Sequence, residues 1–255
     1  DPILNFDKFN GEVWSVDKQS DGSIIVAGLF TTYRGTAVNK ICKINSDGTI
    51  NQTFTDNLST LPNLNNTNIT GIKIIVTKNA IQFSSALQNG SNATTATIAA
   101  DTISVMASYA GGIVVTNSDV TIKGRVFRIN SDGSKDITFS STSNYGVNGI
   151  LNDMALDRRG YLYVVGNFDR IGVNTIYTGG IGKYCNKLMV IKPDGNQGGG
   201  SMFGFTNPFQ FSDINDRPQS IDIIPSTSYV AGTLFYDDRI IIGGKIAKFG
   251  QSTPY

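Results

Sequence analysis

The chain repeats a pattern of short runs in which apolar and polar residues alternate. In the clearest copy, Val13–Asp17 alternates, Ser20-Asp21-Gly22 is a predicted turn, and Ser23–Gly28 is a nearly continuous apolar run. Alternation with a period of two is typical of a half-buried strand, and Gly supplies the positive φ angle that a tight turn requires. A third alternating strand is predicted at Lys40–Ile44, and the unit closes at Phe54.

The same order of strand, turn, strand and third strand returns along the chain. We expect repeat units near residues 11–54, 102–139, 149–211 and 218–255, the last of them incomplete, and a fainter copy near residues 69–100. In the fainter copy, Lys78-Asn79 occupies the turn and Thr94–Ala99 is the proposed third strand. No segment offers ten or more residues with apolar positions at helical spacing. The pattern therefore predicts more than about 35% strand and less than about 8% helix.

Units of this kind predict a β-propeller. Each would be an antiparallel meander of three or four strands with two faces to cover, so neighbouring units have to stack. Meanders of four short strands arranged radially are the blades of propellers. No linker of domain-separating length interrupts residues 1–255, so we expect one all-β domain. The repeated apolar positions should be buried between stacked blades, namely Val16, Ile25, Ile41, Ile113, Val114, Phe127, Val164, Ile221 and Ile241.

Two stretches of the first unit resemble the delta-60 repeat family. They are residues 9–30, with Gln19-Ser20-Asp21-Gly22 and the apolar strand after it, and residues 40–54, with Lys40–Ile44 leading into Asn45-Ser46-Asp47-Gly48. The resemblance extends to residues 103–172 and, in part, to 218–255. It implies a propeller of the kind found in bacteriophage virion proteins and bacterial surface proteins, and it brings no shared catalytic residues. Residues 1–6 resemble the tail of a repeat and residues 242–255 its middle, so we expect flanking chain or another segment to complete the last unit.

Composition and charge narrow the function classes. Charged residues make up 16% of the chain, Gly occurs 28 times, and the formal net charge is +1. A balanced charge of this size gives no electrostatic footprint for nucleic acid or for an anionic membrane. The longest apolar runs, such as Ile240–Ile242 and Ile72–Val76, are far too short to span a bilayer.

The residue types that most often carry catalysis or metal binding are scarce. There is no histidine, which removes Ser-His-Asp and Cys-His catalysis and His-ligated metals. Cys42 and Cys185 form no CxxC pair for zinc, and we interpret them as buried free thiols, although one bridge between them stays an alternative. The Asp-Gly pairs at residues 21, 47, 132 and 194 are interpreted as hairpin turns and not as calcium ligands, because the spacing of an EF-hand is absent. We therefore expect no catalytic residues, no metal and no cofactor.

Three further features have a structural and a functional interpretation. The carboxylate pairs Asp213 with Asp216 and Asp237 with Asp238 could serve glycoside cleavage, but solvated loops explain them better. The aromatic cluster Phe203, Phe205, Phe209 and Phe211 could bind sugars or a partner, but an alternating buried strand explains it better. The glycine-rich stretches 179–182 and 198–200 carry no Gly-Lys-Ser/Thr and are expected to be loops.

The sequence leaves a structural or binding module as its main functional hypothesis. We expect a bacteriophage virion protein of the tail or adsorption apparatus, held in a large oligomeric assembly and mediating protein–protein assembly or host attachment. A host-surface glycan is also expected among the partners. The alternative is a bacterial surface or secreted propeller that binds glycans or protein partners. A glycoside-cleaving propeller is a distant third. No enzyme activity, nucleic-acid binding or membrane insertion is expected.

Overall fold

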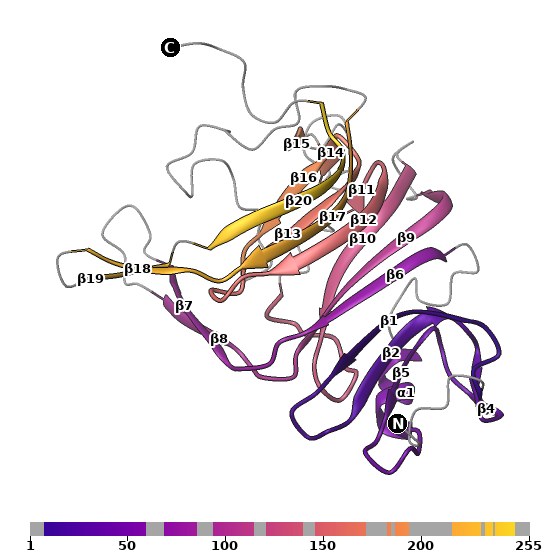
Figure 1. Cartoon of the computed structure of the whole chain (residues 1–255). Coiled ribbons are helices and arrows are strands. Elements are labelled where there is room, and N and C mark those ends of the chain that lie inside the picture. The colour runs from indigo at the N-terminus through magenta and orange to yellow at the C-terminus, as the bar shows by residue number, and fades with distance from the viewer. Residues whose placement is uncertain are drawn as a thin grey trace.

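The computed structural model describes the central strands of four repeat units and part of the chain that connects them (Figure 1). The described residues are 8–59, 69–85, 94–114, 121–139, 146–171, 183–184, 187–193, 216–230, 233–236 and 238–247. Within these ranges the chain forms twenty strands and one helix. The prediction of an all-β fold is confirmed.

The described residues form four antiparallel units that follow one another along the chain, each with two or three central strands. Unit 1 is β1 (Glu12–Lys18), β2 (Ile24–Leu29) and β5 (Ile41–Ile44), in that order. Unit 2 is β6 (Ile69–Val76), β9 (Ile103–Val114) and β10 (Thr121–Ile129). Unit 3 is β12 (Ile150–Leu156), β13 (Leu162–Asn167) and β16 (Leu188–Ile191), and unit 4 is β17 (Arg217–Ile224) with β20 (Arg239–Lys245).

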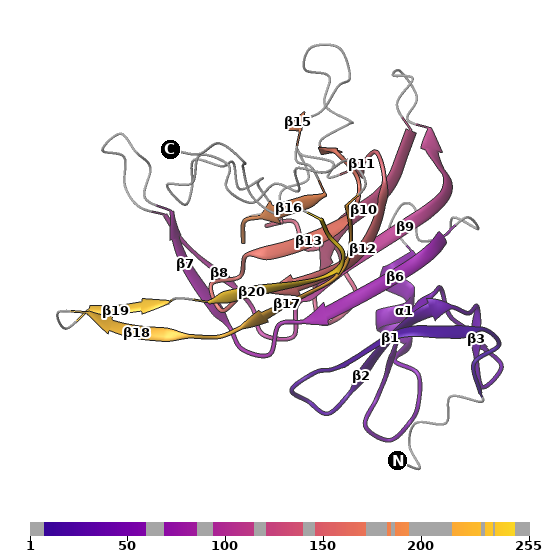
Figure 2. The same ribbon diagram turned by 45° about the horizontal axis from the view of Figure 1, so that its top comes forward.

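Successive units stack face to face in chain order. The first strand of each unit contacts the first strand of the next one, β1 with β6, β6 with β12 and β12 with β17 (Figures 1 and 2). We call the face that a unit turns toward the next unit its forward face, and the opposite one its backward face. The arrangement places the first strands along a common inner side of the stack, which is where the candidate site lies.

A β-bulge at the same place in every first strand aligns the four units residue by residue. The register shifts between Val13 and Ser15, Ile69 and Gly71, Leu151 and Asp153, and Pro218 and Ser220. A bulge inserts one extra residue opposite the partner strand and increases the local twist. Residues counted from the bulge are therefore structurally equivalent. The repeat is thus present in the backbone as well as in the sequence.

The fainter copy near residues 69–100 is not a separate unit. β6 pairs with β9 along its whole length, from Ile69 opposite Tyr109 to Val76 opposite Ile103. The segment between them forms its own hairpin, β7 (Ile81–Ser85) with β8 (Thr94–Ile98). Residues 69–76 and 102–139 therefore belong to one unit with an inserted hairpin. The expected strand near residues 94–99 exists, but it pairs with β7 and lies outside the central sheet of unit 2.

Unit 4 carries a second insertion at the equivalent position. There the first and second strands are connected by the hairpin of β18 (Thr227–Val230) and β19 (Thr233–Tyr236). Both hairpins extend toward the same side of the molecule, on the left of Figures 1 and 2. In units 1 and 3 the same connection is a tight turn. Units 2 and 4 are therefore extended and units 1 and 3 are not.

Short strands complete the outer edges of the units. β3 (Thr32–Tyr33) and β4 (Thr36–Ala37) form a small hairpin after β2. β11 (Gly146–Val147) adds to β10, and β14 (Arg170–Ile171) and β15 (Lys183–Tyr184) extend that sheet further. β14 and β15 belong in sequence to unit 3, so this sheet ties unit 3 to unit 2.

The helix α1 (Gln52–Ser59) is an element that the sequence pattern did not predict. The Asn51 side chain caps it, because its Oδ1 accepts the backbone N–H of Phe54 at 3.0 Å. Phe54 and Leu58 lie one turn apart on one face and are fully buried between units 1 and 2. Two apolar residues in eight are too few to show helical periodicity, which is why the helix was missed.

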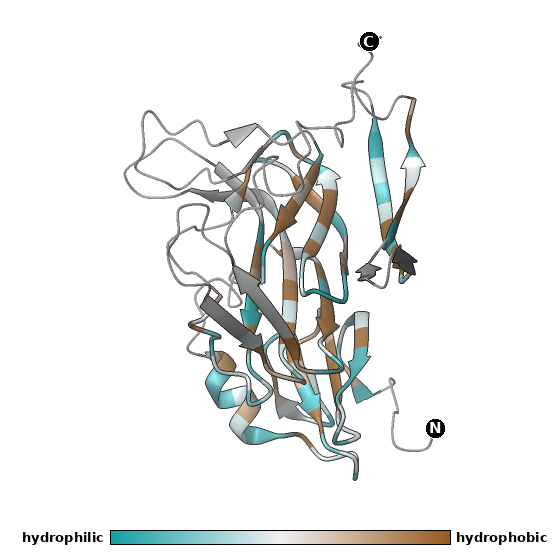
Figure 3. Ribbon diagram, turned by 90° about the vertical axis from the view of Figure 1, so that its left-hand side faces the viewer, coloured by the Kyte–Doolittle hydropathy of each residue, from teal (hydrophilic) through white to brown (hydrophobic). Residues whose placement is uncertain are grey.

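Apolar clusters fill each of the three interfaces between units. One cluster joins Ile25 and Ile41 of unit 1 to unit 2, a second joins units 2 and 3 around Val164, and a third joins units 3 and 4 around Ile221. Apolar residues (brown in Figure 3) accordingly concentrate on the central strands. These four predicted core residues are buried, and Phe127 is partly buried.

Two predicted core residues are not buried. Val16 is 43% exposed and Ile241 is 50% exposed. The prediction was wrong for both because it assumed that every unit is covered on both faces. Val16 is on unit 1 and Ile241 on unit 4, the two ends of the described stack. Ile113 and Val114 lie in β9, and their side chains are outside the described part of the chain.

Candidate functional site

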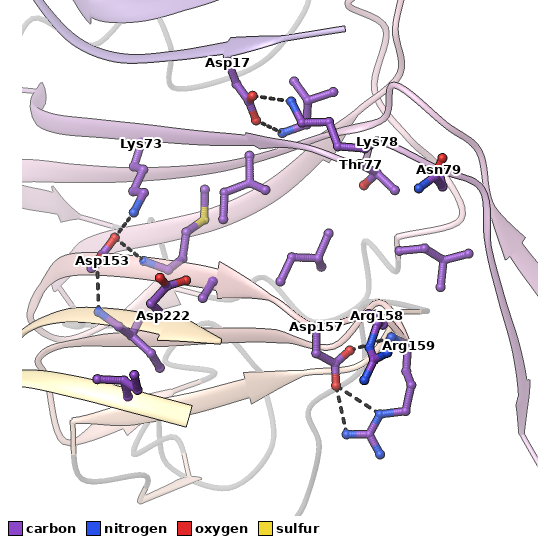
Figure 4. A pocket seen from close by; sticks show the side chains of 18 of the residues that line it. Asp17, Lys73, Thr77, Lys78, Asn79, Asp153, Asp157, Arg158, Arg159 and Asp222 are labelled. Atoms are coloured by element: carbon purple, nitrogen blue, oxygen red, sulfur yellow. Dashed lines mark hydrogen bonds and ion pairs between the residues drawn. The ribbon is translucent and has the colours of Figure 1, made fainter. Parts of the chain in front are cut away.

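A cleft of about 1110 Å³ opens along the inner side of the stack. Its lining comes from the first strands of all four units, from the turns after β6 and β12, and from Ile81 of β7 and Ile241 of β20 (Figure 4). Its polar lining includes Asp17, Lys73, Lys78, Asn79, Asp153, Asp157, Arg158, Arg159 and Asp222. Four of these side chains are acidic and four are basic, so the cleft has both signs of charge in balance.

Ser15 and Asp17 of unit 1 bind the backbone of unit 2. The N–H of Ile74 donates to Ser15 Oγ at 3.1 Å, and the N–H of Val76 donates to Asp17 Oδ2 at 2.7 Å. The Lys78 ammonium pairs with the other Asp17 oxygen (Figure 4). The edge of β6 that faces away from β9 has no neighbouring strand in its sheet. These side chains therefore supply acceptors for N–H groups that the sheet leaves unpaired.

Asp153 connects three units. Its Oδ1 forms an ion pair with Lys73 of unit 2 and accepts the N–H of Met154 at 2.8 Å. Its Oδ2 accepts the N–H of Ile221 in unit 4 at 3.0 Å. The carboxylate is mostly buried, and charge-assisted hydrogen bonds of this kind are stronger than neutral ones. Asp153 therefore links its own strand β12 to the first strands β6 and β17 of the two neighbouring units.

A second charged group lies where the turn of unit 3 meets unit 4. Burial raises the pKa of Asp157, even though its carboxylate accepts N–H groups of Arg159 and Tyr161 and pairs with the Arg159 guanidinium. Burial would also raise the pKa of Asp238, but hydrogen bonds from Arg158 and from the N–H of Ser226 outweigh it and lower that pKa. Arg158 thereby links the turn of unit 3 to the insertion of unit 4.

Tyr163 lies close to both of these carboxylates. Burial, followed by the charges of Asp157 and Asp238, raises the pKa of its phenol above the usual range. The phenol thus stays protonated at neutral pH and is a neutral hydrogen-bonding group at the interface of units 3 and 4.

The charged residues of the cleft are mainly engaged in bonds within and between the units. Asp17, Asp153 and Asp157 each accept at least one backbone N–H and pair with a basic side chain. Asp222 differs, because among the described residues its carboxylate accepts only the N–H of the adjacent Ile223, at 2.8 Å. Asp222 and Asn79 are exposed on the lining, where they can bind polar groups of a ligand or partner.

The Asp-Gly pairs form turns, as the sequence predicted. Gly22, Gly48 and Gly133 have φ angles of 86°, 84° and 85°. Each preceding aspartate accepts the N–H of the residue two positions later, at 2.8 to 2.9 Å. Such local hydrogen bonds are those of an Asx turn, so these carboxylates are occupied by the backbone. The fourth pair, at residues 194–195, lies outside the described residues.

Of the other residues that the sequence singled out, the structure describes only some. Asp216 is buried at the start of β17, where Oδ1 accepts the N–H of Ala247, and Asp238 pairs with Arg158. Their expected partners Asp213 and Asp237 lie outside the described residues, so neither pairing is placed. The same holds for Cys185, for the glycine-rich stretches 179–182 and 198–200, and for Phe203, Phe205, Phe209 and Phe211.

Cys42 is a buried free thiol, and burial raises its pKa to about 12. In the described ranges, no three His, Cys, Asp or Glu side chains gather as a metal site would require. The helix that these ranges contain is neither long nor apolar enough to cross a membrane.

The cleft was not identified by the sequence analysis. Its residues occur singly in first strands and turns, and only stacking brings them together. One signal was present, because Ser15-Val16-Asp17 and Ser220-Ile221-Asp222 repeat the same polar–apolar–polar order at equivalent positions.

Stacked antiparallel units around a common inner side define a β-propeller, and the four units are its blades. Comparison with protein families agrees with this class. Residues 19–54 match the family described as "Domain of unknown function (DUF5122) beta-propeller". No curated protein and no solved structure matches the chain.

Proposed function

We propose that the chain is a structural and binding module of a bacteriophage particle, placed in the tail or adsorption apparatus. In this role it mediates protein–protein assembly or host attachment and does not catalyse a reaction. The delta-60 resemblance of residues 9–30 and 40–54 supports the virion setting.

One observation carries the structural role. The cleft carboxylates Asp17, Asp153 and Asp157 are engaged in bonds within and between units. A general acid and base need a proton-transfer site that faces substrate. These groups instead accept backbone N–H groups and pair with Lys78, Lys73 and Arg159. The binding role rests on the open cleft and on the two hairpins that extend toward one side of the molecule.

The test of the virion setting is localisation. An antibody against residues 1–255 should label purified phage particles at the tail, and the cell-envelope fraction of uninfected cells serves as the control. Purified chain incubated with host polysaccharides should release no new reducing ends. Label confined to the cell envelope, or polysaccharide cleavage that Asp153→Asn and Asp222→Asn abolish, would contradict the proposal.

The second candidate is a bacterial surface or secreted propeller that binds glycans. The observation that favours it is the exposure of Asp222 and Asn79 on the cleft lining, because carboxylate and amide groups bind sugar hydroxyls. A glycan array tests it directly. Binding that Asp222→Ala removes would favour this candidate.

A further inference from the structure

The forward face of unit 4 has the features of an interface between units, yet it lies open. At each formed interface, one apolar residue of the second strand lies on the forward face. It pairs across the two strands with the third residue after the bulge of the first strand. The first three such residues, Ile25, Met106 and Tyr163, are 0%, 3% and 6% exposed. The fourth, Ile241, pairs with Asp222 in the same register and is 50% exposed.

The polar part of this interface is present as well. Ser220 and Asp222 are equivalent to Ser15 and Asp17, which bind two backbone N–H groups of unit 2. Ser220 is exposed, and Asp222 has no bond to another unit among the described residues. Unit 4 thus repeats the Ser-apolar-Asp arrangement with which unit 1 holds its neighbour.

The backward face of unit 1 is the matching open face. Its first-strand residue Val16 is equivalent to Ile72, Met154 and Ile221, which are 1–4% exposed, whereas Val16 is 43% exposed. At the formed interfaces the equivalent residues share one apolar cluster: Ile25 with Ile72, Met106 with Met154, and Tyr163 with Ile221. The pair that would complete this series is Ile241 with Val16.

Charge favours the same match. Lys18 alternates with Val16 on β1, so it shares the backward face, and it is exposed. The equivalent residues of the other units are Ile74, Leu156 and Ile223, so this basic side chain is particular to unit 1. Asp222 on the forward face of unit 4 has the opposite charge.

We propose that the forward face of unit 4 binds the backward face of unit 1 of a second copy of this chain. The inference rests on the proposed structural function and names a partner for it. Such a contact is head-to-tail, and two copies that meet at both ends close into a ring. Two sets of four units give eight blades, which is within the range of known propellers. The occupant is a second copy because the two open faces of one chain carry the complementary residues and both remain exposed within that chain.

The test measures solution mass by light scattering and analytical ultracentrifugation across a concentration series. Wild-type chain should be dimeric, and Ile241→Asp or Val16→Asp should each raise the dissociation constant tenfold or more, a change on the order of that for one lost anchor residue. Ile137→Asp is the matched control, because Ile137 is 83% exposed and follows β10 in unit 2, which carries neither of the two faces. A monomeric wild type, or a dimer that both interface variants leave unchanged, would overturn the proposal.

Two further arms distinguish this geometry from other dimers. The exchange Asp222→Lys with Lys18→Asp should restore dimerisation that each single change weakens. A mixture of the Ile241→Asp and Val16→Asp chains should regain association, because one of its two interfaces is then unaltered. A symmetric contact of unit 4 with unit 4 would be insensitive to Val16→Asp, and that result would also overturn the proposal. A monomer found in phage particles would refute this inference and leave the proposed function intact.

Discussion

The guanidinium of Arg128 in unit 2 donates a hydrogen bond to the main-chain oxygen of Pro193 in unit 3, at 2.8 Å. In unit 1, Lys43 has the same place before an Asn-Ser-Asp-Gly turn as Arg128 has in unit 2, and its ammonium lies 3.5 Å from the main-chain oxygen of Ser131 in unit 2. Both basic side chains are buried. A cation in the third strand of one unit therefore reaches the turn of the next, at the outer side of the stack.

Removing the Arg128 charge should destabilise the fold strongly. Arg128 also pairs with Asp136, and the two side chains are only 4% and 9% exposed. Arg128→Met leaves the Asp136 carboxylate buried without its partner, which should cost about 3–5 kcal/mol in urea unfolding. The double variant Arg128→Met with Asp136→Leu should recover much of that loss. A double variant no more stable than the single one would show that the unpaired charge is not the cause.

Acid should remove the contribution of Asp136. Burial raises its pKa, but hydrogen bonds from Thr138 and the charge and hydrogen bond of Arg128 outweigh burial, so the net pKa is below the ordinary 3.8. A lowered pKa contributes stability above the unfolded value that is lost as pH falls through the folded value. Asp136→Asn should therefore be less stable than wild type near neutral pH, and the gap should narrow below about pH 4. Thermal unfolding over a pH series measures this, with exposed Asp222→Asn as the control. A gap that stays constant would contradict the assignment.

The turn at Gly22 should be sensitive to any side chain. Its φ angle of 86° is unfavourable for other residues, although an added Cβ would meet only Ser46 Cβ at an ordinary 3.7 Å. Gly22→Val should thus cost about 1–3 kcal/mol through backbone strain, without a steric clash. Gly71→Ala is the control, because Gly71 has an ordinary φ and room for a methyl group. An unchanged melting midpoint for Gly22→Val would show that the turn is wrongly assigned.

Equivalent positions in units 1 and 4 should respond differently to truncation. Ile25 is fully buried between units 1 and 2, so Ile25→Ala should cost about 2–4 kcal/mol from lost burial and the cavity left behind. Ile241→Ala should cost less than about 1 kcal/mol at concentrations that keep the chain monomeric, because that side chain is half exposed. Chemical unfolding of both variants checks the difference. Equal losses would mean that unit 4 is covered within the chain.

The sequence alone determined the strands and the turns. Strands and turns can be predicted locally, because their signals are alternating apolar residues and turn glycines at neighbouring positions. Val13–Asp17 and Gly22 are examples. The helix α1 was not predicted, because it is short and has a single pair of buried apolar residues, Phe54 and Leu58. One such pair is too weak a periodic signal, even though Asn51 caps the helix.

Only the tertiary structure decided which strands pair and which faces stay open. Residues 69–76 could have paired with the strand that follows Lys78-Asn79. Pairing with β9 instead gives β6 a longer partner, and the apolar side chains of both strands are then buried against unit 1. Periodicity cannot rank such alternatives, because pairing depends on the area each choice buries far along the chain. For the same reason Val16 and Ile241 looked like core residues. Burial of a strand residue depends on a neighbouring unit, and no pattern within the strand records whether that neighbour is there.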